Sequence, residues 1–389
     1  MTRDTLYIDD EDRYSRLRLI AWWDQDKLTA ARVLVVGAGA LGNEVLKNLA
    51  LLGVGQVTVV DFDKIEDTNL TRSVLFRARD RGLSKAIAAA AAMADMNPDT
   101  HVDALDANII TEVGLGVFAD ADVVIGCLDN REARLWVNRC CWKVGTPWVD
   151  GGIQEINGVA KVFVPPDGAC YECAMTENDY RLINLRYSCP LLRREDLLAG
   201  KVPTAPTIAS MIGGLQTQEA LKLIHGMPVD EGHALVFNGA ANQFYKTRYP
   251  HREDCLSHDT WPTPIELPLS ADNTAAELFA AAAPHFEEGT ALELHLERDL
   301  ILDLYCGKCD QRQRMMKAQL SVSMRDAACP TCGETGKPNM VHAVAANSPL
   351  VEEKLRSLGI PPYDIVRITS PTAEQVFLLA ADRPARRPA

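Results

Sequence analysis

The first half of the chain alternates short apolar runs with stretches of helical periodicity. Residues 33–36 form one apolar run, residues 44–52 repeat apolar positions at helical spacing, and residues 57–60 form a second apolar run. Short continuous apolar runs are typical of strands that are covered on both faces. This order therefore predicts a strand–helix–strand unit of a parallel sheet.

The alternation continues to about residue 225. It predicts further strands at 102–105, 121–127, 148–152 and 158–164, and helices at 81–96, 131–143 and 207–225. Such alternation is typical of a doubly wound, Rossmann-like α/β sheet. In a sheet of this kind the ligand binds at the carboxyl ends of the strands.

A glycine-rich turn joins the first strand to the first helix. Gly37, Gly39 and Gly42 have the G-x-G-x-x-G spacing, which lets a phosphate approach the N-terminus of the helix. Asp61 ends the second strand, where an acidic residue often binds a ribose hydroxyl. The motif predicts a nucleotide site, and the alternative is a turn that serves only packing.

Polar residues after the second strand favour a triphosphate over a dinucleotide such as NAD. They are Asp63, Asn69, Arg72 and Lys85. The outer phosphates of a triphosphate need fixed positive charge and hydrogen-bond donors, which Arg72, Lys85 and Asn69 can supply. For each residue taken alone, a solvated charged loop is the competing interpretation.

These residues also resemble a known family. The pattern D-x-D-x-I-x-x-x-N-L-x-R, from Asp61 to Arg72, resembles the ThiF, MoeB and ubiquitin-activating enzyme superfamily, and the similarity extends over about residues 13–258. Enzymes of this superfamily use ATP and Mg²⁺ to adenylate the C-terminal glycine of a ubiquitin-like protein. The resemblance implies that Asp129 helps to bind Mg²⁺, and capping of the helix at 131–143 is its alternative role.

A segment near the N-terminus resembles the same superfamily. Arg13-Tyr14-Ser15-Arg16 is similar to the opening sequence of the MoeB group, with Leu17 where that group has Gln. The resemblance implies that Arg16 crosses a homodimer interface and contacts the ATP phosphates of the partner subunit. A surface helix arginine is the alternative.

Composition and charge narrow the class of protein. The 389 residues carry a formal net charge of −13. An acidic chain is a poor partner for nucleic acid or an anionic membrane, and no apolar run approaches the ~18 residues of a membrane span. The polar, acidic N-terminus predicts no signal peptide. Three C-x-x-C pairs among the eleven cysteines favour a reducing compartment, so we expect a cytoplasmic protein.

Four cysteines in the last quarter of the chain predict a zinc ribbon at 306–332. Cys306, Cys309, Cys329 and Cys332 form C-x₂-C-x₁₉-C-x₂-C, which is within the spacing of zinc ribbons. Four thiolates make a closed tetrahedral site. The metal is therefore expected to be structural and not catalytic.

A second metal-ligating set is spread along the chain. Cys170 and Cys173 form one C-x-x-C pair, and Cys255 and His258 follow much later at the same spacing. A Cys₃His set is acceptable for structural zinc. ThiF and MoeB have C-x-x-C at both positions, so the resemblance implies a zinc site in which His258 replaces the fourth cysteine.

Cys189 is the candidate nucleophile. It has no C-x-x-C partner, and Arg186, Arg193 and Arg194 lie near it in sequence, where positive charge lowers a thiol pKa. Its segment, about 180–206, resembles the crossover loop that holds the reactive cysteine of the family, and an inert loop thiol is the alternative. The other lone cysteines lie in apolar or helical stretches and are expected in the core: Cys127, Cys140 and Cys141.

Prolines 262, 264 and 268 predict a domain boundary, with a ThiF-type adenylation domain at 1–261 and a smaller domain at 262–389. The pattern in the smaller domain predicts strands at 265–269, 292–296, 300–305, 340–344, 365–368 and 376–379, helices at 274–286 and 350–358, and an acidic-basic turn between the second and third strands. This α+β, β-grasp-like order faintly resembles the ubiquitin-fold domain of eukaryotic activating enzymes, which recruits the conjugating enzyme.

The expected function is that of a bacterial-type activating enzyme for a ubiquitin-like protein. Adenylation would be followed by thioester formation on Cys189 and transfer to a conjugating enzyme, as in bacterial operons of which some act in antiviral defence. The alternative within the class is a sulfur-carrier protein adenylyltransferase. The alternatives of other classes are an NAD oxidoreductase and a non-catalytic zinc scaffold.

Overall fold

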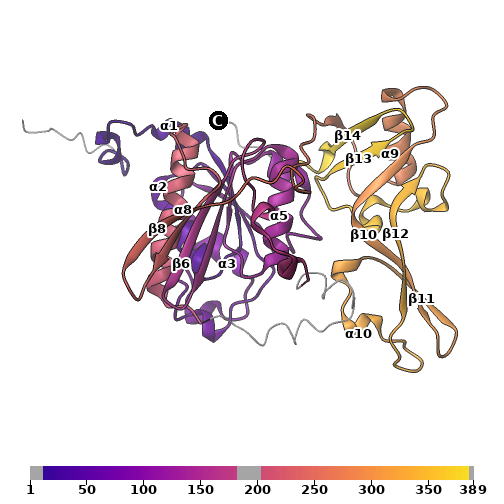
Figure 1. The fold of residues 1–389 in the computed structure, drawn as a ribbon, viewed down its shortest axis with the longest axis horizontal. Helices are drawn as coiled ribbons and strands as arrows, with labels where there is room; N and C mark the ends of the chain where they lie inside the picture. Colours follow the sequence, from indigo (N-terminus) through magenta and orange to yellow (C-terminus); the bar gives the residue numbers. More distant parts are fainter. Residues whose placement is uncertain (1–11, 182–202, 385–389) are drawn as a thin grey trace, which may run out of the picture.

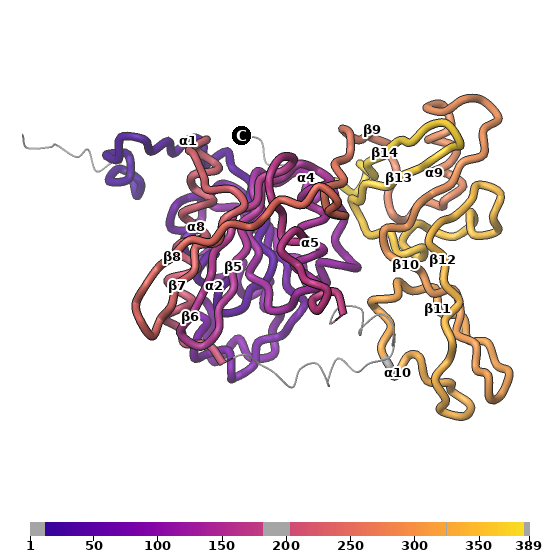
Figure 2. The backbone as a smooth tube through the Cα atoms, in the orientation of Figure 1, coloured from indigo at the N-terminus to yellow at the C-terminus, as the bar shows by residue number. Residues whose placement is uncertain are grey.

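The computed structural model describes residues 12–181 and 203–384, which form two β-sheets side by side along the longest axis (Figure 1). Residues 32–248 build an eight-stranded sheet, and residues 265–379 build a six-stranded sheet. The connection between them crosses the front of the first unit before it reaches the second sheet (Figure 2).

The eight-stranded sheet has the order β3-β2-β1-β4-β5-β6-β7-β8. Its first five strands are parallel, and β5 to β8 continue antiparallel. The strands are β1 (Arg32–Val36), β2 (Gln56–Val60), β3 (His101–Leu105), β4 (Val123–Gly126), β5 (Trp148–Gln154), β6 (Asn157–Phe163), β7 (His233–Asn238) and β8 (Gln243–Arg248). The strand order reverses between β1 and β4, where doubly wound sheets open a ligand crevice.

Helices cover both faces of this sheet because its central strands are apolar on both sides. The helices are α1 (Gln25–Ala30), α2 (Ala40–Leu52), α3 (Lys85–Met96), α4 (Leu115–Ala119), α5 (Arg131–Val144) and α8 (Pro206–His225). Helices α2, α3 and α8 share one apolar core with the sheet, and α4 and α5 share the other. The α/β, doubly wound prediction is confirmed, while α1 and α4 were not predicted. No described helix is long and apolar enough to cross a membrane.

The second sheet is mixed and carries α9 (Ala275–Ala282) on its core. Its order is β11-β10-β13-β14-β9, with β12 also paired to β10. The strands are β9 (Ile265–Leu267), β10 (Glu293–Cys306), β11 (Gln311–Ala318), β12 (Lys337–Ala345), β13 (Ile365–Thr369) and β14 (Glu374–Leu379). Strand β11 was not predicted. The distal halves of β10, β11 and β12 extend away from this core toward the short helix α10 (Met324–Ala327) (Figure 1).

Two predicted elements of the second sheet are wrong. The acidic-basic residues 297–299 lie inside the continuous strand β10 and do not form a turn, because Arg298 is buried and paired with Asp364, the residue just before β13. The predicted helix at 350–358 is two 3₁₀ turns, Pro349–Glu352 and Leu355–Leu358. Between them the backbone is extended and pairs with the start of α9, so an α-helix cannot continue through it.

The two sheets share an apolar core. Tyr363, Ile365 and Leu378 of the second unit are buried in the same cluster as Phe118 of α4 and Trp142 of α5. The domain boundary near Trp261 stays a prediction, and this shared core means that the two sheets pack as neighbours rather than independently.

A buried ion pair joins the second sheet to the first. Nη1 of Arg298 donates to Asp364 at 2.9 Å, and both side chains are only 5% exposed. Arg298 also donates to the backbone carbonyls of Ile110 and Val113 before α4, while Asp364 accepts from the amide of Leu115. The pair therefore satisfies backbone groups of one unit with side chains of the other.

Arg298→Ala should lower the free energy of unfolding by about 3–5 kcal/mol, because Asp364 would remain buried without its counter-charge. Arg18→Ala is the matched control, since it breaks an ion pair whose side chains are 48% and 41% exposed and should cost less than ~1 kcal/mol. Urea denaturation followed by circular dichroism measures both losses. Equal losses in the two variants would contradict a structural role for the buried pair.

Candidate active site

The glycine turn follows β1 at the point where the strand order reverses, and its first glycine cannot be replaced without strain. Gly37 has a φ of +98°, and a Cβ there would lie 2.4 Å from the carbonyl oxygen of Cys127 at the end of β4. A Cβ on Gly42 would lie 2.0 Å from the carbonyl oxygen of Gly37. The two glycines therefore let β1, α2 and β4 approach one another closely.

Gly39 differs from the other two because a Cβ there would meet nothing within 4 Å. It is the N-cap of α2, makes no side-chain cap, and faces open space at the N-terminus of the helix. The first turn of α2 carries no acidic residue. Amide donors and the positive end of the helix dipole are thus available to an anion such as phosphate.

Asp61 links the glycine turn to the loop after β2. Its carboxylate accepts from the amide of Ala38 at 2.7 Å and from the amide of Asp63 at 2.8 Å. Burial raises the pKa of Asp61, and Lys85 opposes the shift. One carboxylate oxygen of Asp61 therefore fixes the glycine turn, and the other fixes the loop after β2. That Asp61 binds a ribose hydroxyl stays a prediction.

Lys85 lies in the first turn of α3 and is held by the same loop. Its Nζ donates to the carboxylate of Asp63 at 2.9 Å, and its side chain is 11% exposed. Because a cation is unfavourable at the N-terminus of a helix, Asp63 compensates for its placement there. Lys85 is therefore presented at the crevice by a carboxylate that a phosphate could replace.

Arg72 and Asn69 lie on the loop that follows. Arg72 donates to the carbonyl of Thr68 at 2.6 Å, and within the described part of the chain no carboxylate lies at ion-pair distance from it. Asn69 accepts from the amide of Glu66 at 2.9 Å and closes a short 3₁₀ turn, so its carbonyl oxygen has a structural role. Of the two side chains, that of Arg72 has fewer structural contacts to give up when it binds a ligand.

Sequence reasoning missed Asn43, which fastens this loop to the glycine turn. Asn43 is fully buried in α2 and donates to the carbonyls of Ala38 at 2.8 Å and Gly39 at 3.0 Å. Its own oxygen accepts from the amide of Leu75 at 2.9 Å, three residues after Arg72. An asparagine directly after the last glycine of the motif, within the helix, was the available signal, because asparagine is a poor residue for a helix interior.

Asp129 follows β4 at the same edge of the sheet and is exposed. The alternative that it caps α5 is wrong: Asn130 is the N-cap, and its side chain accepts from the amide of Ala133 at 2.8 Å. Asp129 accepts only a 3.2 Å contact from Asn130 among the hydrogen bonds of the described residues. Its carboxylate is therefore available to a ligand.

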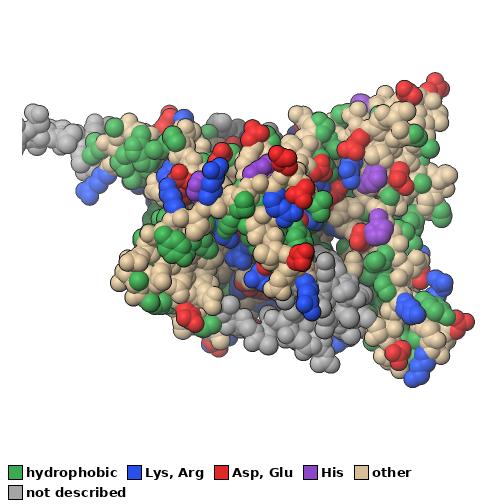
Figure 3. Space-filling model, viewed as in Figure 1, with side chains coloured by type: hydrophobic (Ala, Val, Ile, Leu, Met, Phe, Trp, Pro, Cys, Tyr) green, Lys and Arg blue, Asp and Glu red, His purple; other side chains and the backbone are tan. Residues whose placement is uncertain are grey.

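Arg16 is not part of the crevice of its own chain. Tyr14, two residues earlier, lies against Gly53 at the far end of α2 and receives a hydrogen bond from Asn97 after α3. Thirteen residues of α2, about 20 Å of helix, separate this end from the glycine turn. Arg16 is exposed, and exposed apolar residues follow it in the sequence. Apolar side chains gather over this N-terminal segment (Figure 3).

A model of the ThiF family matches residues 12–257, which is well over half of the chain. The chain belongs to the ThiF family. This membership confirms the resemblance noted from the motifs and places the chain among adenylyltransferases of the E1 and ThiF class.

Curated relatives of this ThiF-family chain have several names. It is 34% identical over 258 residues to the SAMP-activating enzyme E1 of Haloferax volcanii, covering 63% of this chain and 87% of that enzyme. It is 32% identical over 236 residues to the sulfur carrier protein ThiS adenylyltransferase of Escherichia coli, covering 60% and 88%. It is 30% identical over 232 residues to ubiquitin-like modifier-activating enzyme 5 of Bombyx mori, covering 55% and 57%.

Solved structures agree with the family. The structure of E. coli MccB with ATP superposes with a TM-score of 0.54 at 25% identity, covering 64% of this chain and 74% of MccB. MccB with succinimide gives a TM-score of 0.52 at 26% identity over the same shares. A relative of the same fold is thus solved with a nucleoside triphosphate.

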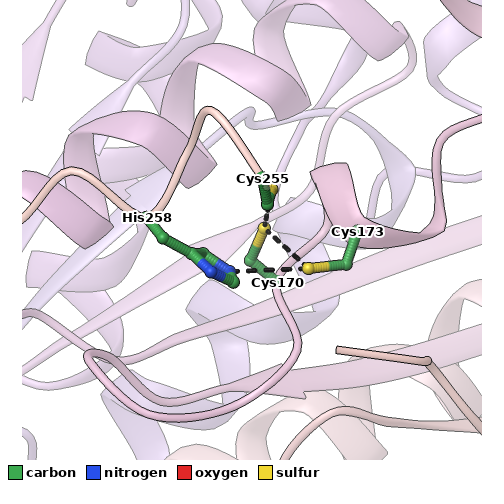
Figure 4. Close-up of side chains that lie close together, drawn as sticks. All are labelled: Cys170, Cys173, Cys255 and His258. Carbon is green, nitrogen blue, oxygen red and sulfur yellow. Dashed lines mark hydrogen bonds between the residues drawn. The ribbon is translucent and has the colours of Figure 1, made fainter. Parts of the chain in front are cut away.

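The first cysteine set of the ThiF-family chain converges (Figure 4). Its ligand atoms lie within 4.8 Å of one another: Cys170, Cys173, Cys255 and His258. Neighbouring pairs are 3.5–3.7 Å apart, close to the roughly 3.8 Å between thiolates around tetrahedral zinc. Burial lowers the pKa of His258, which favours the neutral imidazole that binds metal. The donor set fits one structural zinc ion.

The residue between the two paired cysteines supports this set. Glu172 is fully buried and accepts from Arg139 of α5 at 2.7 Å, from Tyr180 at 2.9 Å and from Ser257. Burial alone would raise the pKa of Glu172, and these donors lower it. The hydrogen bonds fasten both halves of the set to α5.

The second cysteine set also converges, at the far end of β10. Cys306 lies 3.5 Å from Cys332, and Cys309 lies 3.4 Å from Cys329. The backbone amides of Thr331 and of Cys332 lower the pKa of Cys329 to about 6, as expected for a thiolate ligand. The geometry suits the predicted zinc ribbon.

The predicted nucleophile and its neighbouring arginines lie outside the described residues: Cys189, Arg186, Arg193 and Arg194. Described residues close to both ends of this segment contact other parts of the chain. Tyr180 is bonded to Glu172 on the α5 face, and Thr204 pairs with Glu155 just before α8.

Elemental analysis of the purified chain should find two zinc ions per molecule. Cys173→Ser and Cys309→Ser should each lose one ion, because each removes a ligand from a different set. Cys141→Ser, a buried cysteine outside both sets, should retain both. A single ion in the wild-type chain that survives Cys173→Ser would disprove the Cys₃His site.

Proposed function

We propose that the chain is an ATP-dependent activating enzyme for a ubiquitin-like protein. A carboxylate oxygen of the partner's C-terminal glycine attacks the α-phosphate of ATP, so that an acyl-adenylate forms and pyrophosphate leaves. The observation that carries this proposal is the grouping of an open glycine turn, two cations and an uncommitted carboxylate around one crevice: Gly39, Arg72, Lys85 and Asp129.

Charge around the crevice supports a triphosphate. Lys85 is neutralised by Asp63 in this structure, and Arg72 bonds only a backbone carbonyl among its described contacts. Phosphate oxygens offer both side chains stronger, charge-assisted hydrogen bonds. Stabilisation of charge and positioning then supply most of the rate enhancement, as expected when the protein forms no bond to phosphorus.

The donor set also suits magnesium. Asp129 offers carboxylate oxygens at the carboxyl end of β4, and hard oxygen ligands are those that Mg²⁺ prefers. When bound, Mg²⁺ neutralises phosphate charge. Asp129 would hold it by one or both oxygens beside the glycine turn.

A homodimer would complete the site. Arg16 lies at the opposite end of α2 from the crevice of its own chain, so it can reach a nucleotide only in a second copy. Leu19, Ile20 and Trp22, which follow it, are 50%, 38% and 42% exposed, an apolar surface that a partner subunit would cover.

In the second step the thiolate of Cys189 attacks the acyl carbonyl, so that a thioester forms and AMP leaves. The ten cysteines in the described residues support this assignment, because each is either a candidate metal ligand or a buried thiol. Seven belong to the two metal sets, and burial raises the pKa of the thiols of Cys127, Cys140 and Cys141. A thiol with a raised pKa is a poor nucleophile at neutral pH.

The second sheet and its ribbon would dock a conjugating enzyme. We assign it a β-grasp-like fold from its mixed sheet and from α9 on one face. The matched stretch of the ThiS adenylyltransferase covers 88% of that enzyme and 60% of this chain. The second sheet is therefore extra, and transfer to a further protein is a use for it.

A sulfur-carrier protein adenylyltransferase is the second candidate, because the ThiS enzyme is nearly as similar as the SAMP-activating enzyme. It shares the adenylation step and differs in the fate of the acyl-adenylate. In that case Cys189 would carry a persulfide or take no part.

Arg72→Ala should weaken ATP binding at least tenfold and AMP binding by less than about twofold, because one charged hydrogen bond to an outer phosphate contributes about 1.5–3 kcal/mol. Arg81→Ala is the control, since Arg81 is on the same loop but pairs with Asp67. Calorimetric titrations with ATP, AMP and NAD measure the affinities. Tighter binding of NAD than of ATP by the wild type would disprove the nucleotide assignment.

Cys189→Ala should retain ATP–pyrophosphate exchange with a ubiquitin-like protein that ends in glycine, and should lose the reductant-sensitive adduct with that protein. The reason is that adenylation needs no thiol and the thioester does. Non-reducing gel electrophoresis detects the adduct. If the adduct persists in Cys189→Ala, another residue is the nucleophile; if the wild type forms none, the sulfur-carrier function is favoured.

A further inference from the structure

A buried carboxylate lies beneath the crevice between two cations. Asp150 at the end of the parallel part of β5 is fully buried. One of its oxygens accepts from Nε of Arg134 at 3.0 Å, and the other from Nζ of Lys161 at 2.8 Å. The two cationic side chains are 14% and 12% exposed. Neither zinc set uses these residues, nor does the glycine turn.

The guanidinium of Arg134 also donates hydrogen bonds to two backbone carbonyls. Its Nη2 donates to the carbonyl of Leu128 and, at 2.9 Å, to the carbonyl of Gly151. The peptide plane of Leu128 is the one that joins it to Asp129. Arg134 therefore holds the backbone from which the candidate metal ligand projects.

The strand end before Asp129 is held by side chains from other elements as well. Gln216 of α8 is fully buried and donates to the carbonyl of Gly126 at 2.8 Å. The amide of Cys127 donates to the carbonyl of Val36 at 2.8 Å. Gly126 to Leu128 are thus fastened at each residue, and Arg134 provides the last contact before the crevice.

We propose that Arg134, oriented by Asp150, is a positioning residue that sets Asp129 for the metal–nucleotide complex. The proposal rests on the proposed function, because it assigns Asp129 to Mg²⁺ bound with ATP. Neither Arg134 nor Asp150 touches the nucleotide in this account. They act on the geometry of the metal ligand, as outer partners of metal sites do.

The charges alternate along this path. Lys161, Asp150, Arg134 and Asp129 run from β6 to the crevice as cation, anion, cation and anion, and Arg134 lies within electrostatic range of Asp129. Without the negative charge of Asp150, Asp129 remains as a carboxylate whose charge acts on Arg134. The guanidinium would then compete with Mg²⁺ for that carboxylate.

The shape of Arg134 matters as well as its charge, because its planar guanidinium donates hydrogen bonds to three acceptors at once. A lysine at position 134 would keep the positive charge but could not reach Asp150, Leu128 and Gly151 together. Both variants should therefore disturb the position of Arg134. Asp150→Asn does so by removing a charge, and Arg134→Lys does so by removing the planar guanidinium.

The test is the difference in ATP affinity with Mg²⁺ and with EDTA, measured by calorimetry on the full chain without protein partner. Wild type should bind ATP more tightly with Mg²⁺. Asp150→Asn and Arg134→Lys should reduce that gain about tenfold or more, the effect of an outer partner on metal affinity. Their affinity for ATP in EDTA should stay within about twofold of wild type. Lys222→Met, which breaks the ion pair with Glu219 on α8, should keep the full gain.

The outcomes separate the two claims. If both variants keep the full gain in ATP affinity from Mg²⁺, the positioning role is overturned and the proposed function stands. The same conclusion follows if the variants lose ATP affinity equally with Mg²⁺ and with EDTA, because that loss would mean general damage to the nucleotide site. If Asp150→Asn fails to fold, Arg134→Lys decides alone. A wild type that binds no ATP overturns the proposed function and this inference together.

Discussion

A close backbone contact beneath the glycine turn determines how the crevice is built. The carbonyl oxygen of Cys127 lies 2.4 Å from the position that a Cβ on Gly37 would take, and the carbonyl oxygen of Gly37 lies 2.0 Å from that of a Cβ on Gly42. Any larger side chain would push β4 and α2 away from β1. These close contacts bring the start of α2 and the chain just after β4, which leads to Asp129, to the same edge of the sheet.

Buried or largely buried polar side chains then hold the loops at that edge of the sheet. Asn43 fastens the loop of Arg72 to the glycine turn, and Arg134 fastens the strand end before Asp129. At the far side, Arg298 satisfies backbone carbonyls next to α4 and fixes the second sheet against the first. A buried polar group is costly unless fully bonded, so each of these residues specifies one arrangement.

The sequence predicted the parallel sheet, the glycine turn and the four ribbon cysteines from local patterns, whereas the Cys₃His set, whose two halves are far apart in sequence, was predicted with the help of the family resemblance. The sequence could not show that Asn43, Arg134 and Arg298 act across elements, since their partners are distant in sequence. Residues 297–299 looked like a turn because three charged residues in a row are usually solvated, and a buried partner at Asp364 reversed that expectation. The N-cap of α5 shifted by one residue for a similar reason: Asp129 and Asn130 are both good caps.

The central claim is that this crevice joins a nucleotide to the carboxyl end of a protein. Mass spectrometry of a ubiquitin-like protein ending in glycine, after incubation with the chain, ATP and Mg²⁺, tests it most directly. The account predicts a mass increase of one adenylyl group located on the C-terminal glycine, and none when that glycine is removed. An adenylyl group found on another residue, or ATP left intact with every such protein tried, would contradict it.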